Sequence, residues 1–370
     1  MRRALSSHRL RLIGGMALGA AVLAMFAQAS TKENVRAELI RLQNQSGLSL
    51  VSFEGALRNG NLYVVAFASR SLSETQLSRE ENMGEGAISS DGTEIAFERR
   101  RPIGQTVATL TGKGLPEHRN YLGIIRRDGS DLREYPDLDE PYDLCWSPDG
   151  SILALTVKNL KQGKDTARGL QILNLSTGST EEVDAKGYAT SQCWSPDGKQ
   201  IVYHADSTLR VYDIRDKKSR TLANGDQATW SPDGNWIAFL EDDGYYAIRP
   251  SGNERRRLFK KKDALTALWW SPDSRFVVYL SRNRFFEGPW WPPIEQGRLR
   301  VRRLDDNAED WVANLYIEGH VPSFQWVKGI EPNAHAERTS RVHSLSDQRP
   351  NLKPTRYPNF PRVDFCRRNP

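Results

Sequence analysis

Four aspartates that recur in the same sequence context are the first residues here that could do chemistry. Asp149, Asp197, Asp233 and Asp273 each follow a Ser-Pro pair and precede a glycine or a serine. Carboxylates repeated in this way could act as general acids or bases. The same aspartate also hydrogen-bonds its own backbone in a tight turn, and that role explains the pattern without a reaction. We therefore assign none of the four to catalysis.

Other signals for catalysis or metal binding are weak. The histidines beyond the N-terminal segment are His118, His204, His320, His335 and His343. None has H-x-x-x-H or H-E-x-x-H spacing, and the sequence contains no G-x-S-x-G nucleophile turn. We expect no catalytic residue, no metal site and no cofactor. The alternative is that the fold gathers ligands from distant segments around His204 or His320.

One segment has the composition of a protein interface. It contains Arg282, Arg284, Phe285, Phe286, Trp290 and Trp291, together with three prolines. Large aromatic side chains beside arginines are typical of interface hot spots. The alternative is that residues 285–293 fold inward and close a channel as a plug.

Two further segments, residues 99–119 and 158–168, are basic. They include Arg100, Arg119 and Lys164. With the aromatic segment they predict a binding rim for a protein or peptide, acidic in character, or for an anionic glycan. For any single residue the alternative is a solvated charged face.

An internal repeat indicates the elements that position these segments. The motif Trp-Ser-Pro-Asp-Gly, or a close variant, begins at Trp146, Trp194, Trp230 and Trp270, at intervals of 36 to 48 residues. Such intervals are typical of four-stranded propeller blades. Proline presets the turn, Asp bonds the backbone and Gly takes a left-handed conformation, so each motif predicts a hairpin turn. The turn residues, with a weaker first copy, are Asp91, Gly92, Pro148, Asp149, Gly150, Pro196, Asp197, Gly198, Pro232, Asp233, Gly234, Pro272 and Asp273.

The sequence after each turn reads as a strand. Residues 201–203 and 276–279 are β-branched and aromatic, and residues 245–248 and 254–259 provide a third strand and a charged edge strand. Motif, strand and later polar turn together resemble the WD40-like (PD40) repeats of TolB-type propellers, over residues 86–327. The resemblance implies an all-β propeller with a role in protein assembly in the cell envelope. Related propellers also cap serine peptidases or act on carbohydrates.

We expect six four-stranded blades closed by the two ends of the chain. Five blades follow one another between residues 86 and 315. Residues 321–327 resemble a first strand without its blade, and residues 61–67 resemble strands that lack a first strand. Pairing the two ends would remove open sheet edges, so Trp326 should lie near residues 61–67.

Blade topology predicts where the three special segments lie. In an antiparallel blade the first and third turns share one face, and the second turns and the crossovers share the other. The Ser-Pro-Asp-Gly turns therefore mark one face. Residues 99–119, 158–168 and 282–297 are expected to be loops between second and third strands, on the opposite face, where binding residues are common.

The N-terminal residues 1–29 have the form of a secretory signal peptide. Arginines precede an apolar stretch that ends in Ala27-Gln28-Ala29. We expect cleavage after Ala29 and a periplasmic or secreted protein, with an N-terminal membrane anchor as the alternative. Without the arginines of this segment the formal charge of +6 falls close to neutrality, so nucleic acid is not an expected partner.

Three further segments complete the expected organisation. Residues 30–48 form an N-terminal segment suited to a short helix, residues 49–331 form the propeller, and residues 332–370 form a disordered basic tail. Cys145 and Cys193 occupy equivalent positions in neighbouring repeats, which are too far apart for a disulfide. We expect both to be buried free thiols.

These features predict an exported, non-catalytic propeller that serves as a scaffold for protein–protein interaction in the cell envelope. The alternative is a carbohydrate-active, lyase-type or other metal-assisted propeller enzyme. Convergence of histidine and acidic side chains around a bound metal in the propeller channel would favour the enzyme.

Overall fold

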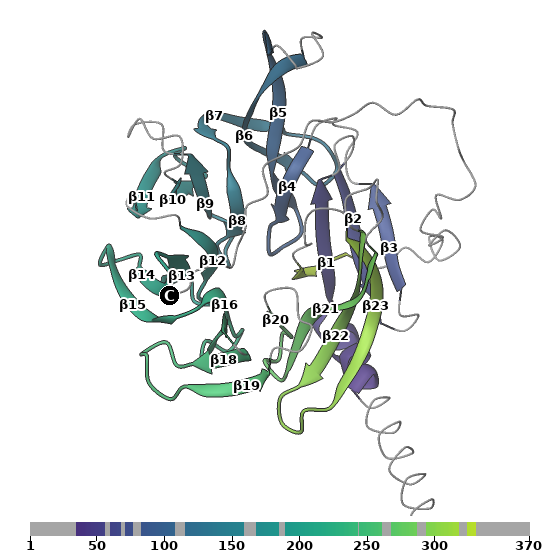
Figure 1. The fold of residues 1–370 in the computed structure, drawn as a ribbon. Coiled ribbons are helices and arrows are strands. Elements are labelled where there is room, and N and C mark those ends of the chain that lie inside the picture. Colours follow the sequence, from purple (N-terminus) through teal and green to yellow (C-terminus); the bar gives the residue numbers. More distant parts are fainter. Residues whose placement is uncertain are drawn as a thin grey trace, which may run out of the picture.

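The computed structural model contains six four-stranded antiparallel sheets. They are arranged around a common axis as the blades of a six-bladed β-propeller (Figure 1), which confirms the expected fold class and blade number. The residues that the structure describes are 35–55, 60–67, 71–76, 83–107, 115–158, 168–184, 189–242, 244–260, 268–286, 294–317 and 324–330.

Five blades are continuous in sequence. Blade 1 comprises β4 (Met83–Ile88), β5 (Glu94–Val107), β6 (Leu115–Arg126) and β7 (Arg133–Asp139). Blade 2 comprises β8 (Tyr142–Trp146), β9 (Ile152–Lys158), β10 (Arg168–Asn174) and β11 (Thr180–Asp184). Blade 3 comprises β12 (Thr190–Trp194), β13 (Gln200–Ala205), β14 (Thr208–Asp213) and β15 (Lys218–Asn224). Blade 4 comprises β16 (Asp226–Trp230), β17 (Ile237–Glu241), β18 (Gly244–Ile248) and β19 (Arg256–Lys260). Blade 5 comprises β20 (Trp269–Trp270), β21 (Phe276–Phe286), β22 (Ile294–Arg303) and β23 (Glu309–Ile317).

Blade 6 joins the two ends of the propeller, as the sequence predicted. Its strand order is β24 (Gln325–Lys328), β1 (Leu48–Gly55), β2 (Gly60–Ala66) and β3 (Ser71–Gln76). The rings of Trp326 and Phe67 stack with their centroids 5.8 Å apart, so Trp326 does lie beside residues 61–67. The strand that pairs directly with β24 is β1, a strand that the repeat motifs do not predict.

The repeated motifs form hairpin turns built on a buried serine. In blade 2, Ser147 Oγ donates to Asp149 Oδ1 (2.7 Å) and accepts from the amide of Ile152 (2.9 Å). Gly150 has a φ of 72°, in the left-handed region that favours glycine. The bond from Ser147, together with bonds from the amide and hydroxyl of Ser151, lowers the pKa of Asp149, since these bonds stabilise its charged form.

The same hydroxyl-to-carboxylate bond recurs in the turns of blades 1, 3, 4 and 5. The turn of blade 5 has a serine where the others have glycine. Ser274 has a φ of 59°, and its hydroxyl accepts a 3.1 Å hydrogen bond from the amide of Asp233 in the neighbouring blade.

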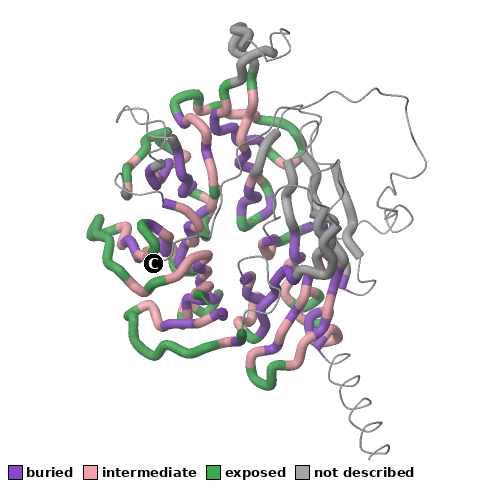
Figure 2. Tube along the Cα trace, in the orientation of Figure 1, coloured by how far each residue is buried: buried purple, intermediate pink, exposed green. Residues whose placement is uncertain are grey.

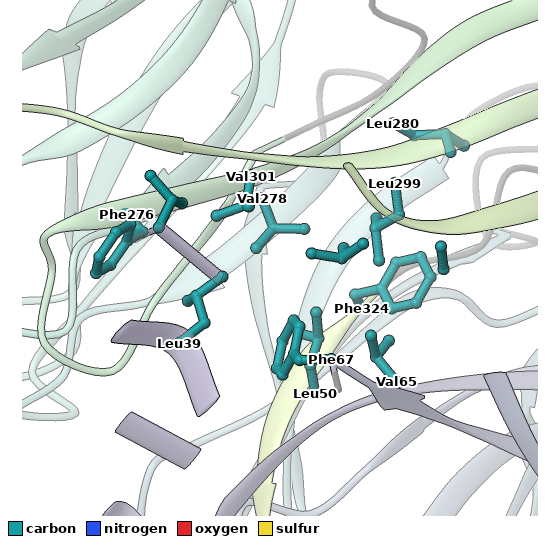
Figure 3. Close-up of a cluster of buried hydrophobic side chains, with 13 residues drawn as sticks. Leu39, Leu50, Val65, Phe67, Phe276, Val278, Leu280, Leu299, Val301 and Phe324 are labelled. Carbon is teal, nitrogen blue, oxygen red and sulfur yellow. The ribbon is translucent and has the colours of Figure 1, made fainter. Parts of the chain in front are cut away.

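Within the described residues the core consists of six hydrophobic clusters, one between each pair of neighbouring blades. Figure 2 shows the buried residues along the strands, with the exposed residues concentrated at the outer turns. Figure 3 shows the cluster between blades 5 and 6, which includes Leu50, Phe67, Phe276 and Val301. Burial of strand faces between radial sheets is what holds the ring together.

Residues 35–46 form a helix that packs against this last cluster. Val35 and Leu39 are fully buried. The Glu38 carboxylate accepts hydrogen bonds from Arg303 (2.5 Å) and Arg275 (3.1 Å) of blade 5. The helix therefore covers the junction between blade 5 and the closing blade.

The remaining expectations concern the cysteines and the chain ends. Cys145 and Cys193 are both free cysteines, as expected, and each residue is half-buried. Burial of the sulfur atoms raises the pKa of both thiols. No helix among the described residues has the length and apolar character needed to span a bilayer. The predicted signal peptide, residues 1–29, and the predicted tail, residues 332–370, lie outside the described residues.

Candidate binding face

The face that carries the second turns, here called the second-turn face, is extended in two blades. β5 and β6 have 14 and 12 residues, and β21 and β22 have 11 and 10, whereas the equivalent strands of blades 2 to 4 have five to seven. Two of the predicted insertions, residues 99–119 and 282–297, are therefore mostly hairpin and not loop. Cross-strand pairing continues through residues 99–107 and 282–286, and we correct the loop prediction accordingly.

Arg100 and Arg119 lie on the hairpin of blade 1. Arg100 Nε donates to Asn120 Oδ1 (3.3 Å), and Arg119 Nε lies 3.3 Å from Asp139 Oδ1 on the outer strand β7. Arg101, directly opposite Arg119, pairs with Glu134 at 2.7 Å. The carboxylates of β7 thus neutralise part of the positive charge of residues 99–119.

Glu134 is the centre of these contacts. It accepts a hydrogen bond from the Tyr121 hydroxyl (2.8 Å) and pairs with Arg99 (3.1 Å) as well as Arg101. Burial and the bond to Glu134 raise the pKa of Tyr121. A network of charged and polar groups therefore joins the hairpin of blade 1 to the outer strand β7. This network fixes the position of the hairpin on the second-turn face.

The backbone of β21 carries the first part of the aromatic segment. Arg282 pairs with Gly297, Arg284 with Gln296, Phe285 with Glu295 and Phe286 with Ile294, with a register shift after Arg282. Trp290, Trp291 and Lys164 lie outside the described residues. Whether residues 285–293 form an interface or a plug thus stays a prediction.

The start of the inner strands is a feature that the sequence reading missed. In β8, β12 and β16 the register shifts near the first residues, and Asp143, Ser191 and Gln227 take left-handed φ values of 48°, 55° and 53°. Left-handed backbone at residues other than glycine costs energy and is concentrated at functional sites. The inner strands begin at the second-turn face, so these three strained residues lie around the propeller axis on that face.

Polar contacts join the first two of these strand starts. The amide of Ser191 donates to Asp143 Oδ2 (3.1 Å), and the Gln192 side-chain amide donates to the backbone carbonyl of Asp143. Thr156 Oγ1 donates to the carbonyl of Ala189 (2.8 Å). Blades 2 and 3 are therefore linked by hydrogen bonds at this end of the axis.

A similar group lies between blades 3 and 4. His204 Nδ1 is 3.3 Å from Thr190 Oγ1 and 3.8 Å from Asp226 Oδ1. The amide of Gln227 donates to Asp226 Oδ1 (2.6 Å), whereas Gln227 Oε1 is buried without a hydrogen-bond partner among the described residues. A buried acceptor of this kind is one to which a ligand could donate.

This arrangement can bind polar groups through fixed donors and acceptors. No group of three or more His, Cys, Asp and Glu residues placed to hold a metal ion occurs in the described part of the chain. A sequence signal for the strand starts does exist. Asp143, Ser191 and Gln227 each stand three residues before the repeat tryptophan, where a purely structural strand would accept an apolar residue.

No family model matches this chain, and no curated protein sequence matches it. Similar folds exist among solved structures. TolB from Acinetobacter baumannii superposes with a TM-score of 0.51 at 16% identity, over 76% of this chain and 66% of that chain. The putative TolB from Agrobacterium tumefaciens gives 0.51 at 18% identity, over 71% and 91%. An oligogalacturonate lyase from Vibrio parahaemolyticus gives 0.44 at 14% identity, over 62% and 71%.

The two TolB structures define the class of fold. This chain is a six-bladed, TolB-like β-propeller. It spans just under two thirds of the length of the Acinetobacter protein. Identities this low concern the fold alone, because one propeller fold hosts many unrelated functions.

Proposed function

We propose that this chain is a non-catalytic, extracytoplasmic propeller that binds a protein or peptide partner on its second-turn face. The observation that carries the proposal is the coincidence, on one face, of two extended hairpins and three strained polar strand starts around the axis. Rigid sheets hold these groups in place, and pre-organised groups lose little entropy on binding. No comparable extension occurs on the face of the Ser-Pro-Asp-Gly turns in the described residues.

Several details of the proposal come from the sequence. We take residues 1–29 as a signal peptide cleaved after Ala29, which would place the propeller in the periplasm or outside the cell. Arg282, Arg284, Phe285, Phe286, Trp290 and Trp291 would provide the aromatic part of the contact. Arg100, Arg119 and Lys164 would favour an acidic partner segment. The similarity of the fold to the two TolB structures supports a protein partner.

The experiment is capture of partners from a native envelope extract by tagged, folded protein. The double variant W290A/W291A should lose the partner. A control pair on the opposite face, S176A/T177A, should retain it, since both residues are exposed turn residues there. Equal capture by both double variants would reject the aromatic segment as part of the site.

A further inference from the structure

The outer strands of the propeller, each taken with the turn before it, are basic in blades 3 and 4 and acidic in blades 1, 2 and 5. In blades 3 and 4, the outer strand and the turn before it, residues 215–224 and 249–260, carry four and five basic residues and one acidic residue each. The matching segments of blades 1, 2 and 5, residues 127–139, 175–184 and 304–317, carry a surplus of three or four acidic residues. We call residues 215–224 and 249–260 the basic rim.

The two halves of the basic rim form one surface. A guanidinium N–H of Arg220 donates to the backbone carbonyl of Pro250, which joins β15 to the turn before β19. Figure 1 shows β15 and β19 as neighbouring outer strands, and Figure 2 shows that both are largely exposed. The third turns lie on the same face as the Ser-Pro-Asp-Gly turns. The basic rim therefore begins on that face and runs along the outer edge of blades 3 and 4. Only its last residues, Asn224 and Lys260, reach the level of the second turns, opposite Thr208 and Gly244.

Aromatic rings pre-organise the arginines of blade 4. The Arg249 and Arg256 guanidiniums each lie 4.1 Å from the centre of the Trp236 ring. The Arg255 guanidinium lies 4.2 Å from the centre of the Tyr246 ring. Stacking uses the flat face of a guanidinium and leaves the N–H donors in its plane for a ligand. Less side-chain entropy is then lost when an anion binds.

The positive charge of the rim is only partly neutralised. Lys217, Arg249 and Arg255 form ion pairs with Glu181, Glu254 and Glu241. Lys218, Arg256 and Lys260 are exposed, and within the described ranges none has an acidic side chain at ion-pair distance. A partner that brings its own negative charges would complete this surface.

We propose that the basic rim binds an anionic polysaccharide chain. Two extended strands present their charges in lines, which suits a linear polyanion. Planar guanidiniums bind carboxylate and sulfate groups through paired hydrogen bonds. A protein interface needs an apolar centre, but here the aromatic rings lie beneath arginines. Register shifts in β15 and β19 also disfavour addition of a partner strand.

The test measures binding of purified full-length protein to polygalacturonate and dextran sulfate, with neutral dextran as the reference. The variant K218Q/R256Q/K260Q should bind both polyanions about tenfold more weakly, because it loses three exposed positive charges. The control R41Q/R126Q/K328Q removes the same charge at exposed positions of the N-terminal helix and of blades 1 and 6, and should stay within about twofold of the parent. Circular dichroism melting curves establish that both variants are folded. The single variant R256K, which keeps the charge but loses the planar group, should bind with intermediate affinity.

Three results would overturn the proposal. Equal weakening in both triple variants would show that net charge, not the rim, attracts the polymer. Binding to vesicles of anionic phospholipid or to poly-glutamate, without binding to either polysaccharide, would assign the rim to a membrane or a peptide. The third result is self-association of the parent protein at low salt, abolished in the rim variant, again without polysaccharide binding. It would assign the basic rim to contact with the acidic outer strands of a second copy.

Discussion

The indole Nε1 of Trp194 donates a 3.1 Å hydrogen bond to the backbone carbonyl of Cys145, one blade earlier in the ring. Trp146 bonds the carbonyl of Ala87 in the same way (3.0 Å), and Trp270 bonds that of Thr229 (3.3 Å). The repeat tryptophan therefore fastens each inner strand to the previous blade. Trp230 is the exception, because its Nε1 is buried without a partner among the described residues.

This difference predicts the effect of two matched substitutions. W194F should lower the free energy of unfolding by about 1 to 2 kcal/mol more than W230F, because only the first leaves a buried carbonyl without its donor. Both changes remove a similar volume from similar clusters, so the cavity costs nearly cancel in the comparison. Urea unfolding of the two variants measures the difference, and equal losses would contradict this role for Trp194.

The turn aspartates make stability depend on pH. Hydrogen bonds from Ser147 and Ser151 lower the pKa of Asp149 in the folded protein. The stabilisation is then present above the unfolded-state pKa of about 4 and is lost as the pH falls through the lower folded-state value. D149N should cost about 0.5 to 1 kcal/mol at neutral pH, a modest value because the side chain is exposed to solvent. Urea unfolding at several pH values should show this penalty shrinking below about pH 4; a constant penalty would contradict it.

The N-terminal helix should be part of the cooperative fold. Leu39 is fully buried between blades 5 and 6, so L39A should destabilise the propeller by about 2 to 4 kcal/mol. R41A changes an exposed position on the same helix and should be nearly neutral. Thermal melting followed by circular dichroism measures both. A melting temperature that L39A leaves unchanged would show that the helix is not docked.

Gly225, between β15 and β16, is required by space as well as by conformation. Its φ is 138°, and a Cβ there would lie 2.7 Å from Phe239 Cδ2 and 2.8 Å from the carbonyl of Leu240. G225A should therefore cost about 2 to 4 kcal/mol. G150A meets nothing within 4 Å and should cost only about 1 kcal/mol for its left-handed backbone. Comparable costs in denaturant titrations would rule out the steric explanation.

The sequence predicted the ring because each repeat has strong local signals. Ser-Pro-Asp-Gly turns need few contacts beyond their own backbone, so their geometry follows from residue type. The closing blade was also predictable in outline, since Trp326 and residues 61–67 each resembled part of one blade. β1 was missed because its residues contain no repeat motif, and only pairing with β24 identifies it.

The candidate site was less accessible to sequence reasoning. Residues 99–107 and 282–286 were expected in loops because they belong to long stretches between second and third strands, yet cross-strand pairing extends the hairpins through them. The left-handed residues Asp143, Ser191 and Gln227 depend on register shifts against neighbouring strands, which a single strand does not reveal. The basic outer strands of blades 3 and 4 form one surface only because the two blades are neighbours in the ring, and the sequence alone does not show this.

Site-specific photocrosslinking in the native envelope tests the proposed binding face most directly. A photoreactive residue at Arg119, on the hairpin of blade 1, should give a discrete adduct with one partner. The same residue at Thr177, in an exposed turn on the opposite face, should give none. Adducts from Thr177 alone, or equal adducts from both positions, would contradict binding at the second-turn face.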